Sequence, residues 1–295
     1  MRKITIIILT IFLLWIASFF FIKSIETFGY RNSIATIPIK GVISGGEIFG
    51  REIANVDEVI DEIKAASQDK NVKGILLIIN SPGGTAVGSS KIANAIRSVK
   101  KPVVAYIDEI GTSGAYWVAS ASDAIVANPM SITGSIGVTG SYLEFSELLE
   151  KYGVKYEELT SGKYKEIGGP YKKLSEEERD ILLSKLKKIH KHFISDVTKY
   201  RNLSKYAIEE ISTGVFYLGE EAFKLGLVDY LGDKEFAINV TKNLAGVKEA
   251  KLVKYEKRKK RFLSFLERFV ESFSYGIGRG LGAALLEYRR YFILY

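Results

Sequence analysis

The chain has 295 residues, of which 47% are hydrophobic, and its formal net charge is +8. This length suits one large domain or two small ones, and either can bury a sizeable core. Because the chain has no cysteine, disulfides, thiolate catalysis and cysteine-based metal sites are excluded. The chain has two histidines, His190 and His192, so histidine-based chemistry has few candidates.

The N-terminal segment, residues 1–25, is predicted to be a transmembrane anchor. Residues 4–22 form an uncharged apolar run between Lys3 and Lys23. As a helix this run is about 28 Å long, close to the roughly 30 Å hydrocarbon core of a bilayer. A cleaved signal peptide is the alternative, but the bulky residues after Ser18 do not match a small-residue cleavage site. The flanking basic residues favour an N-terminus inside, which would place the remaining chain outside the cytoplasm.

From residue 33 the pattern becomes that of an α/β domain. Short apolar runs rich in branched residues are typical of buried strands. The predicted strands span residues 33–43, 74–79, 102–107 and 124–127. The predicted helices span residues 56–66, 85–99, 115–122 and 175–200. This alternation favours parallel strands joined by crossover helices.

The long helix predicted at residues 175–200 has an apolar stripe that would face the core or another subunit. Its five members share one helical face: Leu182, Leu186, Ile189, Phe193 and Val197. His190 and His192 lie on the same helix, about 200° apart around its axis, so they cannot share a face. We interpret both histidines as solvated or packing residues.

The C-terminal tail, residues 247–295, combines basic charge with an amphipathic pattern. Lysines and arginines dominate residues 251–261, and aromatic residues then recur on one helical face over residues 262–273. The charge is typical of a solvated segment, or of a basic helix lying on an anionic membrane. Nucleic acid binding is disfavoured because no matching fold or motif accompanies the charge.

Ser113 is a candidate nucleophile because it lies where a predicted strand gives way to a helix, at the edge where α/β folds place their sites. By itself this position is more typical of a helix N-cap. However, Gly83 and Gly84 follow the neighbouring strand, and paired glycines let backbone amides approach a ligand as an oxyanion hole. A serine also needs a base. The histidines are poorly placed, and a lysine can serve instead if burial and nearby dipoles lower its pKa.

Taken together, these motifs resemble the signal peptide peptidase A family, membrane serine peptidases distantly similar in fold to the Clp protease and the crotonases. The resemblance covers residues 34–246 and implies a Clp/crotonase-like α/β core within a peptidase domain at 33–246. Its motifs, in chain order, lie at residues 74–84 (GILLIINSPGG), 112–117 (TSGAYW), 133–138 (TGSIGV), 161–166 (SGKYKE) and 219–229.

The resemblance implies a role for each site residue. Ser113 would be the nucleophile and Lys165 the general base. The amides of Gly84 and Gly114 would hold the oxyanion, and Ser135 would orient the lysine amine. The resemblance implies no cofactor and no metal.

One motif contains two lysines, and the motif around Ser113 departs from the family pattern at two positions. Lys163 is a rival base, and we prefer Lys165 because the family lysine follows an aromatic residue or histidine, here Tyr164. Thr112 and Ala115 replace the alanine and glycine usual beside the nucleophile. Both changes would affect the shape of the pocket more than the mechanism.

The resemblance also implies a homo-oligomeric ring in which the lysine of one subunit reaches the serine of the next. The substrates would be remnant signal peptides and other short, unfolded, apolar peptides near the membrane. Three alternatives stay open: a related membrane protease that acts on stomatin-like proteins, a crotonase-like acyl-CoA enzyme, and a non-catalytic membrane scaffold.

Overall fold

The structure is a computed structural model that describes residues 32–255, which belong to one compact unit of the chain. The predicted anchor at residues 1–25 and the tail from residue 256 onward lie outside the described residues. Within residues 32–255, no helix has both the length and the apolar character needed to cross a membrane.

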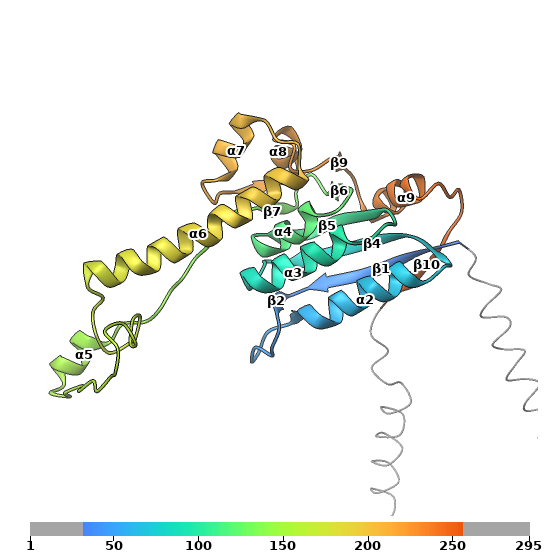
Figure 1. Cartoon of the computed structure of the whole chain (residues 1–295). Coiled ribbons are helices and arrows are strands. Elements are labelled where there is room, and N and C mark those ends of the chain that lie inside the picture. The colour runs from blue at the N-terminus through green and yellow to red at the C-terminus, as the bar shows by residue number, and fades with distance from the viewer. Residues whose placement is uncertain (1–31, 256–295) are drawn as a thin grey trace, which may run out of the picture. The chain divides into compact units, whose positions relative to one another are not determined.

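A mostly parallel, eight-stranded sheet lies at the centre of this unit (Figure 1). Its main path runs in the order β10–β1–β4–β5–β6–β9, while β7 pairs with β5 and with β8. Among the described pairings of this sheet, β7 with β8 is antiparallel and the others are parallel. The strands are β1 Ser33–Lys40, β4 Val72–Ser81, β5 Val103–Thr112, β6 Ala124–Ala127, β7 Ile132–Gly134, β8 Phe216–Leu218, β9 Tyr230–Leu231 and β10 Lys251–Lys254. A separate parallel pair consists of β2 Val42–Ser44 and β3 Ile53–Asn55.

Helices cover both faces of the large sheet, and each face has its own apolar cluster. On one face α2, α3 and α4 pack side by side, with α6 against α4, and on the other lies α9 (Figure 1). The helices are α2 Val56–Gln68, α3 Ala86–Arg97, α4 Gly114–Ser120, α5 Ser146–Lys151, α6 Glu176–Tyr200, α7 Lys205–Ile211, α8 Gly219–Lys224 and α9 Lys234–Leu244. The predicted parallel sheet with crossover helices is therefore confirmed.

One predicted strand is wrong in its extent. The apolar run at 33–43 was predicted as a single strand, but β1 ends at Lys40 and β2 begins at Val42. Gly41 separates them with a φ of 75°, and a side chain there would lie 2.1 Å from the carbonyl oxygen of Glu52. The chain therefore turns at this glycine, where any larger residue would be obstructed.

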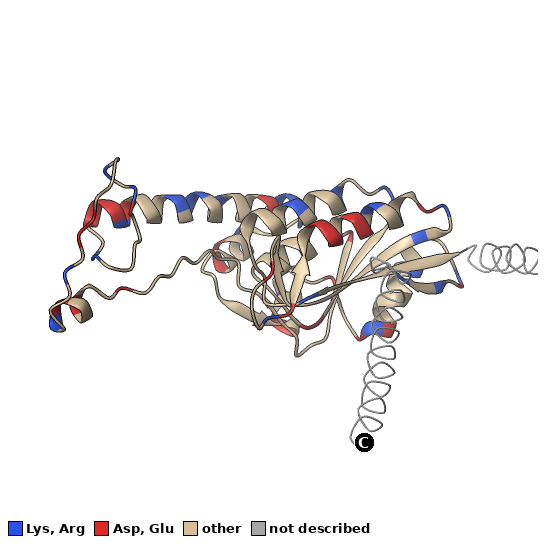
Figure 2. Ribbon diagram, turned by 90° about the horizontal axis from the view of Figure 1, so that it is seen from below, with Lys and Arg blue, Asp and Glu red and all other residues tan. Residues whose placement is uncertain are grey.

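The long helix α6 begins as predicted, with Ser175 as its N-cap in a capping box with Glu178. The apolar stripe divides along its length. Phe193 and Val197 are buried against the core, whereas the stripe members nearer the N-terminus are half-buried. Figures 1 and 2 both show the N-terminal half of α6 projecting beyond the sheet. Residues 137–175, which we call the lysine segment, run outward from β7 and fold at that end of the helix.

Candidate active site

Ser113 occupies a strained turn between β5 and α4. Its φ of 53° and ψ of −125° lie in a region of backbone conformation that non-glycine residues rarely adopt. It stands at the N-cap position of α4, but its side chain makes no capping hydrogen bond. The N-cap alternative therefore does not explain this serine, and the strained strand-to-helix turn is the kind that presents a nucleophile.

The backbone around Ser113 leaves two amides available. The amide of Ser113 itself donates to the carbonyl oxygen of Gly134 at 2.8 Å. The amides of Gly84 and Gly114, by contrast, have no acceptor among the described residues. Gly114 is the first residue of α4, so its N–H also lies at the positive end of that helix.

Glycines allow these amides to lie beside the serine. At Gly83, whose φ is 100°, a Cβ would lie 2.9 Å from Cβ of Ser113 and 2.7 Å from the nitrogen of Gly114. At Gly114, a Cβ would lie 3.2 Å from the nitrogen of Gly84 and 2.2 Å from Oγ of Ser89. The two loops therefore meet without intervening side chains. Two unpaired amides next to a serine hydroxyl can stabilise an oxyanion.

Ser135 lies near the same turn, because β7 pairs with the end of β5. Thr112 is opposite Gly134 in this pairing, and Ser135 follows directly. Ser135 also has a positive φ, 51°, and its amide donates to the carbonyl oxygen of Val215 at 2.9 Å. The structure thus brings Ser113, Ser135 and the two glycine amides together at the carboxyl edge of the sheet.

Lys165 is not brought to this site within one chain. It is exposed in the lysine segment, whose residue Lys163 contacts Glu177 in the first turn of α6. A second contact with α6 lies near the serine. There the carbonyl oxygen of Ile136 is 2.9 Å from the ring of His190, which is much further along the helix than Glu177. Thirteen residues of α6 separate these two contacts, which is about 20 Å along the helix axis. A lysine side chain cannot bridge that distance.

The four lysines between residues 161 and 175 differ in their partners. Nζ of Lys163 lies 2.7 Å from Glu177, and hydrogen bonds to Glu177 and then to Tyr164 raise the pKa of this lysine. Lys172 and Lys173 are paired with carboxylates as well, and these pairings raise their pKa values. Lys165 has no carboxylate partner among the described residues. Since an amine held in its protonated form accepts no proton, the pairing disfavours Lys163 as a base.

The two histidines match their interpretation as packing or solvated residues. The His190 ring contacts the carbonyl oxygen of Ile136, and His192 is exposed on α6. The residues that hold the site rigid were not predicted. Trp117, four residues after Ser113, stacks on Phe193 with ring centroids 4.5 Å apart, and Thr112 Oγ1 donates to the carbonyl oxygen of Pro82 at 3.2 Å. These contacts join α4 to α6 and the nucleophile turn to the glycine loop.

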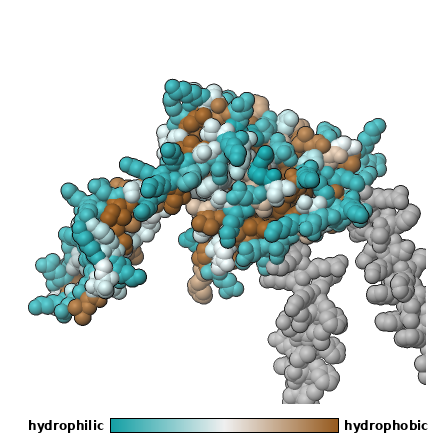
Figure 3. All heavy atoms as spheres, viewed as in Figure 1, coloured by the Kyte–Doolittle hydropathy of each residue, from teal (hydrophilic) through white to brown (hydrophobic). Residues whose placement is uncertain are grey.

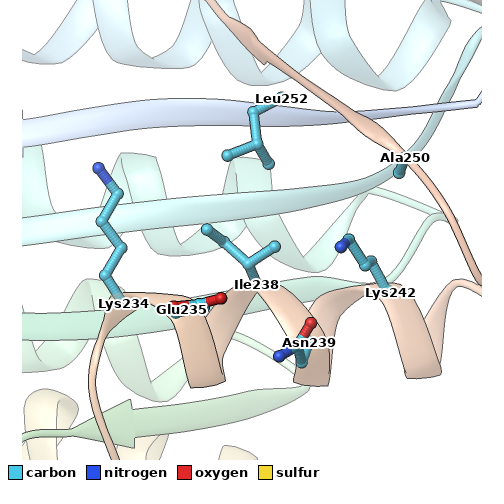
Figure 4. A pocket seen from close by; sticks show the side chains of 7 residues that line it. All are labelled: Lys234, Glu235, Ile238, Asn239, Lys242, Ala250 and Leu252. Atoms are coloured by element: carbon cyan, nitrogen blue, oxygen red, sulfur yellow. The ribbon is translucent and has the colours of Figure 1, made fainter.

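A groove elsewhere on the unit is separate from these residues. It has a volume of about 480 Å³ and lies between α9 and β10, against the other face of the sheet (Figure 4). Its lining consists of Lys234, Glu235, Ile238, Asn239, Lys242, Ala250 and Leu252. Within the described part of the chain, no group of three or more histidines and carboxylates could hold a metal ion.

Comparisons with known proteins identify the family. The sequence model of peptidase family S49 matches residues 95–248, and that of the Clp protease matches residues 40–135. A Methanocaldococcus jannaschii protein named as a protease is 34% identical, over 97% of this chain and 96% of its own. An Enterococcus faecium protein named as signal peptide peptidase SppA is also 34% identical, over 79% of this chain and 70% of its own.

More distant likenesses are also found. Protease 4 of Haemophilus influenzae is 30% identical over 76% of this chain, which spans 37% of that protein. A solved structure of a membrane-bound stomatin-specific protease with a substrate peptide is 16% identical, with a TM-score of 0.47 over 80% of this chain and 98% of that one. The family matches and the two close relatives suffice: the chain belongs to peptidase family S49 and is a serine peptidase.

Proposed function

We propose that this peptidase is membrane-anchored and uses a Ser–Lys dyad in which Ser113 and Lys165 come from neighbouring subunits. The observation that carries the proposal is the turn at Ser113. Its strained backbone places the serine beside two amides, those of Gly84 and Gly114, that have no acceptor among the described residues. Backbone strain of this kind costs about 1–3 kcal/mol and persists mainly where function requires it.

The composition of the lysine segment supports a dyad shared between subunits. None of its residues, 137–175, is buried, although many are apolar. Figure 3 shows apolar side chains at the surface of this region, at the lower left of the view. The most exposed large apolar residues there include Leu143, Leu148, Tyr152, Val154 and Leu159. Such a surface on a segment without its own core is suited to packing against a second copy of the chain.

The proposed assembly would also create the base. A lysine amine becomes a general base when burial lowers its pKa, and Lys165 is exposed in the single chain. A neighbouring subunit that covers the lysine segment would supply this burial and bring the amine to the nucleophile. Ser135, beside the nucleophile, would accept a hydrogen bond from that amine and orient it.

The reaction would be acyl transfer. The Lys165 amine takes the proton of the Ser113 hydroxyl as Oγ bonds to the scissile carbonyl carbon. The carbonyl oxygen becomes an oxyanion and accepts hydrogen bonds from the amides of Gly84 and Gly114. The lysine ammonium then protonates the leaving amine as the C–N bond breaks. Water hydrolyses the acyl-enzyme by the same steps, with the same residues.

We infer the substrates and the location from the apolar N-terminal run and from the name of the Enterococcus faecium relative. The substrates would be remnant signal peptides and other short, unfolded, apolar peptides. The catalytic unit would lie outside the cytoplasm, close to the membrane that holds the anchor.

Hydrolysis of short apolar fluorogenic peptides by the full-length protein tests the dyad. We expect Ser113→Ala and Lys165→Ala each to lower kcat at least about 1,000-fold, because each removes a group that reacts. Lys163→Ala removes the ion pair with Glu177 but leaves Lys165 in place, so it should lower kcat by no more than about 10-fold and serves as the matched lysine control. Full activity in either Ser113→Ala or Lys165→Ala would rule out the assignment.

Mixed oligomers test whether the dyad is shared. Co-expression of Ser113→Ala with Lys165→Ala should restore about a quarter of wild-type activity, since half of the subunits carry the serine and half of their neighbours carry the lysine. A dyad formed within one chain predicts no restoration. Each variant expressed alone provides the inactive baseline.

A further inference from the structure

Glu177 is the residue through which the lysine segment is attached to α6 next to Lys165. Its carboxylate accepts hydrogen bonds from Nζ of Lys163, at 2.7 Å, and from the hydroxyl of Tyr164. Nζ of Lys163 also lies 4.8 Å from the centroid of the Tyr164 ring. These two residues directly precede Lys165, so one carboxylate contacts both of the side chains that come before the proposed base.

Backbone hydrogen bonds link the attached residues to the proposed base. Lys165 lies in a tight turn, where its amide donates to the carbonyl oxygen of Gly162 at 3.0 Å and the amide of Ile167 donates to that of Tyr164 at 3.3 Å. A displacement of Tyr164 therefore displaces Lys165. Further along the segment, Lys172 bridges Glu158 and Glu178 at 3.2 and 3.3 Å, which attaches that part to the same helix end.

We propose that Glu177 is a positioning residue for catalysis: it holds the turn at residues 162–167 on the rigid end of α6, so that Lys165 is presented in a fixed position to the neighbouring subunit. This inference rests on the proposed function of Lys165. Glu177 itself touches neither substrate nor nucleophile. Figure 2 shows the acidic start of α6 beside this segment.

The physical reason is that the lysine segment has no buried residue to fix it. An exposed ion pair adds little to the stability of the fold, because water and salt screen it. Its effect on geometry is a separate matter, since a misplacement of about 1 Å at a reacting group can cost about 100-fold in rate. Glu177 is thus expected to matter for the rate of catalysis more than for the free energy of unfolding.

The first turn of α6 offers a matched control. Glu176 has the same charge at the same helix end, is exposed, and makes no contact with Lys163 or Tyr164 among those described. We expect Glu177→Ala to lower kcat about 10- to 100-fold with KM unchanged, and Glu176→Ala to leave both unchanged. Glu177→Gln keeps a carbonyl oxygen that accepts from Nζ of Lys163, and its amide NH2 can donate to the Tyr164 hydroxyl, so it should restore kcat to within about 3-fold of wild type. Equal effects of Glu176→Ala and Glu177→Ala would overturn the proposal.

Mixed oligomers separate positioning from a general effect on folding. When Glu177→Ala is added to the subunit that carries Lys165 and Ser113→Ala, the restored activity should fall about 10- to 100-fold. When it is added to the subunit that carries Ser113 and Lys165→Ala, the restored activity should not change. An equal loss in both arrangements would overturn the positioning role of Glu177. Absence of restored activity in the mixture without Glu177→Ala would instead contradict the shared dyad itself.

Discussion

The surroundings of Ser113 and those of Lys165 are built by opposite means. Around Ser113, parallel strands and close glycine contacts hold the backbone, and the residues after it, 114–120, are all buried. Around Lys165, no residue of the lysine segment is buried, and ion pairs with the first turn of α6 hold it. One half of the proposed dyad is therefore complete in a single chain, whereas the other depends on exposed contacts.

In the proposed assembly, this difference would keep the enzyme inactive until two subunits meet. A rigid nucleophile and oxyanion hole store backbone strain that the core supports. A base on an exposed segment has the high polarity of water around it until another subunit covers it. Helix α6 joins the two regions, because its C-terminal half packs in the core and its N-terminal half carries the lysine segment.

The largest expected difference is in how much the free energy of unfolding falls when a side chain in each half of α6 is shortened to alanine. Phe193 is 1% exposed and stacks on Trp117, so Phe193→Ala should lower the free energy of unfolding by about 3–5 kcal/mol. Leu183, on the N-terminal half, is 43% exposed, and Leu183→Ala should cost less than about 1 kcal/mol. Urea denaturation measures both. Equal losses would show that the N-terminal half is as firmly packed as the core.

Each of the two regions contains a glycine with positive φ, and the two should differ in their tolerance of a larger residue. Gly83 has a φ of 100° and close neighbours at the nucleophile, whereas Gly162 has a φ of 113° and nothing within 4 Å of a Cβ. Gly83→Ala should cost about 2–4 kcal/mol and most of the peptidase activity, because the new Cβ displaces the turn at Ser113. Gly162→Ala should cost about 1 kcal/mol, from backbone strain alone. Thermal unfolding and peptide hydrolysis of both variants test this, and a larger loss for Gly162→Ala would contradict it.

The smallest expected effect concerns the strain at Ser113. Both Ser113→Gly and Ser113→Ala should be inactive, since each lacks the hydroxyl. Glycine adopts a φ of 53° without steric cost, so Ser113→Gly should be more stable than Ser113→Ala by about 1 kcal/mol. Chemical denaturation of the two inactive variants measures this difference. A more stable alanine variant would show that the turn is unstrained.

Much of the fold could be predicted from local patterns. The buried strand at 124–127 was predicted to the residue, and the long helix was predicted to within one residue from the helical spacing of its apolar residues. The break at Gly41 and the edge strand β10 were not predicted. Gly41 lies where a Cβ would meet the carbonyl oxygen of Glu52, and β10 is an exposed lysine-rich strand whose partner, β1, is distant in sequence. Neither leaves a local signal.

The candidate site likewise combines features that are local in sequence with features that depend on distant contacts. The glycine loop and the strand-to-helix position of Ser113 are local features, so their sequence motifs indicated them. Three features depend on contacts between distant segments: the positive φ of Ser113, the unpaired amides of Gly84 and Gly114, and the ion pair between Lys163 and Glu177. An acidic residue in the first turn of a helix is common, so nothing in the sequence distinguished Glu177 from Glu176.

The amino-acid sequence by itself determined the α/β class, the order of the main elements and the motifs of a serine peptidase. These follow from hydrophobic periodicity, capping and glycine placement, which act over a few residues. The tertiary structure alone decided that Ser113, Ser135 and two glycine amides meet at one edge of the sheet, while the turn that carries Lys165 is attached to α6 at Glu177, about 20 Å along the helix from the contact at His190. That separation depends on how strands pair and where a helix ends, which no local pattern specifies.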